Sequence, residues 1–67
     1  MRSADYDIVI AGEVSDEVAL SFAPLTIDLR GGNTIIHGDA LDQAALIGVL
    51  TRLPGLGMTL LRVERQG

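Results

Sequence analysis

The chain has 67 residues, of which nine are acidic, five are arginine and none is lysine or cysteine, and its formal net charge is −4. The absence of cysteine excludes disulfides, thiolate metal sites and thiol nucleophiles. The arginines are scattered, and one tyrosine and one phenylalanine are the only aromatic residues, which argues against a nucleic-acid surface. The net negative charge also argues against binding to an anionic membrane.

The first residues, MRSADYD, include acids where a signal peptide has its apolar segment, and no apolar run reaches about 18 residues. We therefore expect a soluble, cytoplasmic protein in which residues 1–67 form a single small α+β domain. A chain of this size buries only about 60% of the surface that its unfolded form exposes. Because no disulfide compensates for this thin core, we expect a homo-oligomer.

Two elements are predicted before the first proline. Residues 6–14, YDIVIAGEV, alternate between two faces and predict a first strand. In residues 15–23, Ser15 is a good helix cap, and Asp16 and Glu17 suit the positive end of a helix dipole. These features favour a short helix. The letters VALSF within this segment also alternate, so a bulged strand is the competing interpretation.

The clearest alternation lies in residues 25–30, LTIDLR, where Leu25, Ile27 and Leu29 share one face. The letters GGN that follow tolerate a positive φ. They predict the turn of a hairpin whose second strand is NTIIHG, residues 33–38.

The main helix is predicted over residues 39–53, DALDQAALIGVLTRL, with Asp39 as its N-cap and Asp42 in its first turn. Its apolar residues cover more than the usual stripe of roughly 100°. We therefore expect this helix to contact neighbours on more than one side. Pro54 ends the helix, and residues 58–66 predict the last strand.

The resulting order, β-α-β-β-α-β, predicts a ferredoxin-like sandwich in which a short first helix and a longer second helix cover one face of an antiparallel sheet. If residues 15–23 form a strand, the alternative is an open antiparallel sheet with one helix. Both architectures belong to the α+β class.

Residues 42–65, DQAALIGVLTRLPGLGMTLLRVER, resemble a set of small proteins of high-GC bacteria that carry no known activity. Those proteins share a helix of the pattern DQAAL-x-G-x-L, followed by LG and a final apolar strand. The resemblance implies the same strand, hairpin and helix layout and a bacterial cytoplasmic setting, with no cofactor or substrate. Ile47 stands where those proteins carry a histidine, and Pro54 stands where their helix continues. The matching residues are Asp42, Gln43, Ala44, Ala45, Leu46, Gly48, Leu50, Arg52, Leu56 and Gly57.

The segment HGDALDQ, residues 37–43, places the only histidine close to two aspartates. His37, Asp39 and Asp42 are of the types that bind divalent metals or act in acid-base catalysis. The start of a helix explains the same residues, because Asp39 serves as N-cap and Asp42 lies in the first turn. We therefore expect no metal, no cofactor and no catalytic residue, with these three as the only candidates.

The sheet face that the helices leave uncovered is predicted to be apolar. A contiguous apolar patch of this kind marks an interface, although scattered apolar residues are also ordinary surface. Burial of about 800 Å² per subunit there would add the stability that the small core lacks. Thr26 belongs to the same face. The predicted interface residues are Val9, Ala11, Ile36, Met58 and Leu60.

The sequence thus predicts a small homo-oligomeric interaction or scaffold module without catalytic activity. It would be a dimer through the sheet face or a ring through the strand edges. A second hypothesis is a sensing module that binds an apolar small molecule between subunits. A third is a small enzyme that uses His37 with Asp39 or Asp42.

Overall fold

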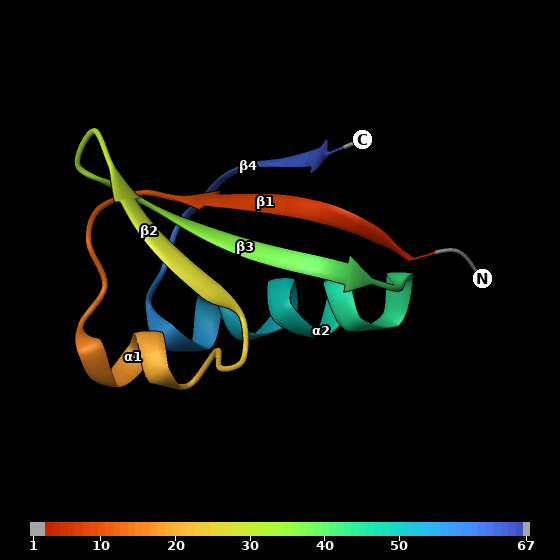
Figure 1. The fold of residues 1–67 in the computed structure, drawn as a ribbon. Helices are drawn as coiled ribbons and strands as arrows, with labels where there is room; N and C mark the ends of the chain where they lie inside the picture. The colour runs from red at the N-terminus through yellow and green to blue at the C-terminus, as the bar shows by residue number, and fades with distance from the viewer. Residues whose placement is uncertain (1–2, 67) are drawn as a thin grey trace.

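The computed structural model describes residues 3–66. Within them, four antiparallel strands form an open sheet in the order β2-β3-β1-β4. Both α-helices lie on the same side of this sheet and leave its other face uncovered (Figure 1). The predicted small α+β architecture with an open antiparallel sheet is confirmed. The elements are β1 (Ala4–Ile10), α1 (Asp16–Leu20), β2 (Thr26–Arg30), β3 (Asn33–Leu41), α2 (Gln43–Arg52), a 3-10 turn η1 (Pro54–Leu56) and β4 (Leu60–Gln66).

The core lies between the sheet and the two helices. The pairing registers align Ile27, Ile36 and Ile8 with Val63 in one row across all four strands. Because alternate residues of a strand share a face, this row and its neighbour Ile10 point toward the helices. The fully packed cluster consists of Ile8, Ile10, Phe22, Ile36, Val49 and Leu53.

Helix α1 forms as predicted and excludes the bulged-strand alternative. The Ser15 hydroxyl accepts a hydrogen bond from the backbone N–H of Val18 at 3.2 Å, which is the expected capping contact. The helix is shorter than predicted because it ends at Leu20, and the following turn inserts Phe22 into the core. The Arg52 guanidinium from α2 lies 4.4 Å above the centroid of the Phe22 ring and joins the two helices.

Helix α2 begins later than the sequence predicted. Its N-cap is Asp42, whose Oδ1 accepts from the N–H of Ala45 at 2.7 Å, and the prediction of Asp39 as N-cap is wrong. Strand pairing explains the shift. Leu41 still pairs with the beginning of β1, and the Asp5 side chain accepts from the N–H of Ala40 at 2.8 Å. These contacts hold the preceding residues in β3, so the helix cannot start before the strand ends.

The boundaries of the outer connections also differ from the sequence prediction. Strand β1 ends at Ile10 because Gly12 turns the chain with φ 80°, and the Thr34 hydroxyl donates to the Gly12 carbonyl at 2.7 Å. Strand β4 begins at Leu60, two residues later than predicted, because the N–H of Met58 bonds back to α2. The first difference arises from a contact between segments distant in sequence, and the second from a local bond between Met58 and Leu53.

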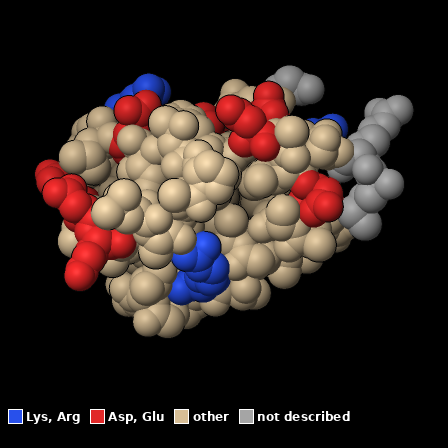
Figure 2. Space-filling view, turned by 60° about the horizontal axis from the view of Figure 1, so that its bottom comes forward, with Lys and Arg blue, Asp and Glu red and all other residues tan. Residues whose placement is uncertain are grey.

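The outward side of α2 has no cover within the described part of the chain. Val49 is the buried residue of this helix, and the Ile47 side chain is 49% exposed. Ala44, Gly48 and Thr51 are also exposed. The expected contacts on more than one side of α2 are therefore not made by residues 3–66. Figure 2 shows the helix side, where uncharged residues occupy most of the surface and acidic groups lie toward its margins.

Candidate functional site

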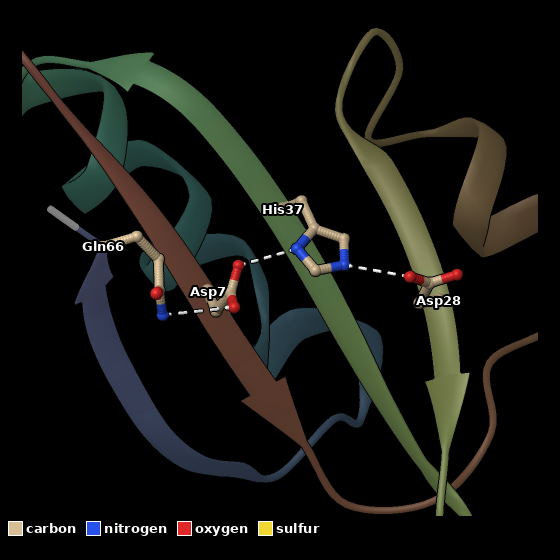
Figure 3. Close-up of polar contacts among 4 residues, drawn as sticks. All are labelled: Asp7, Asp28, His37 and Gln66. Carbon is tan, nitrogen blue, oxygen red and sulfur yellow. Dashed lines mark hydrogen bonds and ion pairs between the residues drawn. The ribbon is translucent and has the colours of Figure 1, made fainter.

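Three strands bring a histidine and two aspartates together on the open face of the sheet (Figure 3). His37 on β3 lies opposite Asp7 on β1 in the strand register. Its Nδ1 is 2.7 Å from Asp7 Oδ1, and its Nε2 is 3.1 Å from Asp28 Oδ2 on β2. We call these three residues the aspartate-histidine cluster. It links β1, β3 and β2 across the face that the helices leave uncovered.

The geometry of the cluster favours a charged imidazole. A neutral imidazole has one N–H donor, whereas both ring nitrogens of His37 face carboxylate oxygens, which accept. The pKa of His37 is accordingly raised above its ordinary value of about 6.5. The hydrogen bond to Asp7 is the main cause, partial burial opposes it, and Asp28 adds a smaller increase. When His37 is protonated, the cluster links three strands through both ring nitrogens.

The polar groups around the cluster are also paired within the chain. Asp7 Oδ2 accepts from the Gln66 side-chain amide of β4 at 3.2 Å. Glu64, which lies beside Asp7 in the strand register, is bonded to Arg62. His37 can act as a base only if it gives up one of its two carboxylate contacts. This arrangement favours a structural link over acid-base chemistry.

The predicted grouping of His37 with Asp39 and Asp42 is wrong. Asp42 caps α2, and Asp39 is exposed near the end of β3. No group of three or more histidine, aspartate or glutamate side chains in residues 3–66 is arranged to hold a metal ion. The true partners, Asp7 and Asp28, are 30 and 9 residues away from His37 in sequence. The sequence feature that could have identified these two partners is their position on the polar side of two predicted strands.

The predicted interface residues do not share one surface. The placement of Ile36 on the open face is wrong, because this residue lies in the core and is fully buried. Ile35 pairs with Val9 on the open face instead, and both are covered by their neighbours. Met58 is half-buried against the core, and the exposed members of the set are Ala11 and Leu60.

A second feature lies at the β2 edge of the sheet, and the sequence prediction missed it. Of the large hydrophobic side chains in the described residues, the two most exposed are Leu20 at 74% and Leu29 at 57%. Leu20 belongs to α1 and lines a groove of about 360 Å³ between that helix and β2. The groove is mostly apolar, and its lining residues are Asp16, Ala19, Leu20, Ala23, Leu25 and Ile27.

Comparison with known families adds the following. The model of a family described as "Domain of unknown function (DUF8691)" matches residues 5–64. The chain belongs to this family. In this DUF8691 protein the match runs from β1 into β4 and includes the cluster and the β2 edge. No curated protein and no solved structure matches the chain. Among the helices described for this DUF8691 protein, none is long and apolar enough to cross a membrane.

Proposed function

We propose that the protein is a small self-associating interaction module whose first partner is a second copy of itself. The observation that carries this proposal is the β2 edge, where Leu29 and an apolar groove lined by Leu20 are exposed to solvent. A large apolar area left in water is costly, and its usual role in a folded protein is to bind a partner.

The small size of the core supports the same proposal. Among the described residues, eight hydrophobic side chains are buried and six of them form the core cluster, whereas the exposed surface amounts to 4312 Å². A stable interface of about 800 Å² per partner covers roughly a fifth of that surface. Association therefore adds a substantial apolar contact to a domain that has no disulfide.

A small-molecule sensing role is the second proposal, and the same groove supports it. Its volume of about 360 Å³ lies at the lower end of the range for ligand pockets, and most of its lining is apolar. An apolar compound without an anionic group is the class of ligand that fits, because Asp16 is the charged residue of the lining. Binding of such a ligand raises the melting temperature, and the rise grows with the logarithm of the ligand concentration once that concentration exceeds Kd. Thermal unfolding at several ligand concentrations measures this rise.

We also propose that the fold is of the ferredoxin-like type. The order β-α-β-β-α-β, with β1 and β3 as the central strands and both helices on one face, supports this assignment. It carries no functional argument, because such folds host many unrelated activities. The bacterial cytoplasmic setting implied by the sequence resemblance stays a prediction.

The mass of the protein in solution tests self-association. We expect light scattering after size-exclusion chromatography to give about twice the chain mass of 7.1 kDa at high protein concentration. The mass should fall toward that of one chain on dilution if the dimer is reversible. A folded protein that stays monomeric at all concentrations would contradict the proposed function.

A further inference from the structure

The two edges of the sheet differ in how well they are protected against pairing with another chain. The β4 edge is interrupted by a register shift opposite Val9 and Ile10, and it carries Arg62, Glu64 and Arg65. Bulges and charges are the usual devices that keep an exposed edge from pairing. The β2 edge also carries charges, Asp28 and Arg30, but it is regular over its whole length, so it is the better protein-binding edge.

The hydrogen-bonding pattern between β2 and β3 leaves the backbone N–H and C=O groups of alternate β2 residues facing away from β3. Arg30 pairs with Asn33 across the two-residue turn, and the closing pair of such a hairpin exchanges both of its backbone bonds. The backbone groups of Asp28 and Thr26 then also face β3. Those of Ile27 and Leu29 point away from the sheet, where an added strand can bond to them.

The charges of β2 select one register for pairing with a second copy. Asp28 and Arg30 lie on the same face of the strand and flank Leu29. An antiparallel pair with its two-fold axis at Leu29 sets each Asp28 opposite the Arg30 of the other copy. This gives two ion pairs of favourable sign. An axis at Asp28 sets two carboxylates against each other, and an axis at Ile27 pairs no charges.

The same axis explains the exposed apolar groups. It brings Leu29 against Leu29 of the second copy on the helix side of the sheet. It sets Ile27 opposite Gly31 of the second copy, so the groove between α1 and β2 faces the hairpin turn of that copy. Leu20, whose side chain is 74% exposed in the single chain, lines this groove.

We infer that a second copy of this chain docks along the β2 edge, with a two-fold axis at Leu29, so that the two sheets join into one continuous sheet. The inference rests on the proposed self-association and names its surface. Interfaces between identical chains are most often two-fold and bring the same patch of each chain together.

Two matched substitutions test the surface. Leu29→Asp places two carboxylates on the axis and should abolish the dimer, whereas Leu61→Asp puts the same group at the other edge. Leu61 is 48% exposed and serves as the control, because the inference predicts no loss of dimer there. Light scattering gives the mass of each variant, and circular dichroism verifies that each is folded.

A third variant covers the case in which Leu29→Asp does not fold. Arg30→Asp replaces both ion pairs by like charges on an exposed side chain and should weaken the dimer about tenfold or more. A dimer that survives both β2 substitutions, or one that Leu61→Asp also disrupts, would overturn the inference and leave self-association standing. A monomeric wild-type protein would instead overturn the proposed function itself.

Discussion

His37 and Asp7 face each other across β3 and β1, with Nδ1 and Oδ1 2.7 Å apart. The second ring nitrogen contacts Asp28. Both contacts can be hydrogen bonds only when the imidazole carries a proton on each nitrogen, which is one more than its neutral form has. The link joins the edge strand β2 to the centre of the sheet. Its protonation state is therefore coupled to how firmly β2 is held.

The stability of the protein should fall as pH rises through the His37 pKa. The folded state binds this proton more tightly than the unfolded chain, in which the histidine pKa is about 6.5. The stabilising contribution is complete below that value and is lost as pH passes the raised folded pKa. Urea unfolding at a fixed protein concentration from pH 5.5 to 8.5 measures the trend. A His37→Gln variant should lose this pH dependence.

The two aspartates should contribute unequally to the pKa of His37. Asp7 makes the shorter contact and is the main cause of the raised pKa, whereas Asp28 is more exposed and adds less. Titration of the His37 ring protons by NMR should therefore show a larger pKa decrease in Asp7→Asn than in Asp28→Asn. The reverse order, or a wild-type pKa below 6.5, would contradict the cluster geometry.

The N-cap of α2 can be tested by a matched pair of aspartates. Asp42→Ala removes the acceptor for the N–H of Ala45 and should lower the free energy of unfolding by about 1 kcal/mol. Asp39→Ala alters an exposed side chain and should change it by less than about 0.5 kcal/mol. Urea unfolding of both variants measures the difference. Equal effects would show that the capping residue is misassigned.

Replacement by alanine should lower the stability of the protein at Gly38 and raise it at Gly48. A Cβ at Gly38 would lie 2.3 Å from Leu41 Cδ1, so Gly38→Ala forces the Leu41 side chain to move and should cost about 1 kcal/mol. A Cβ at Gly48 meets nothing within 4 Å, and Gly48→Ala in the middle of α2 should stabilise by up to about 1 kcal/mol. Thermal unfolding at a fixed concentration compares the two variants, and a shift in the same direction for both would contradict the account.

Local sequence signals predicted much of the fold. The alternation in LTIDLR and the two glycines after it identify the hairpin, and Ser15 with its acidic neighbours identifies α1. These features work because caps and turns depend on residues close together in the chain. The start of α2 could not be found in this way, because Asp39 and Asp42 are both good caps. The pairing of Leu41 with β1 decides between them.

The open face of the sheet was harder to predict for a related reason. Ile35 and Ile36 are adjacent, so alternation alone does not say which one faces the core. The two-residue turn decides, because it sets Ile36 opposite Ile27 on the inner face. The same register brings His37 to Asp7 and Asp28. A cluster drawn from three strands becomes visible in a sequence only after the pairing of those strands is known.

Amide hydrogen exchange in β2 tests the central claim most directly. The N–H groups of Ile27 and Leu29 should exchange quickly in dilute protein and slow down as concentration rises, because the second copy bonds to them. The Asp28 N–H already faces β3 and should change little, which makes it the internal control. Rates for Ile27 and Leu29 that stay fast at concentrations where the mass shows a dimer would contradict pairing through the β2 edge.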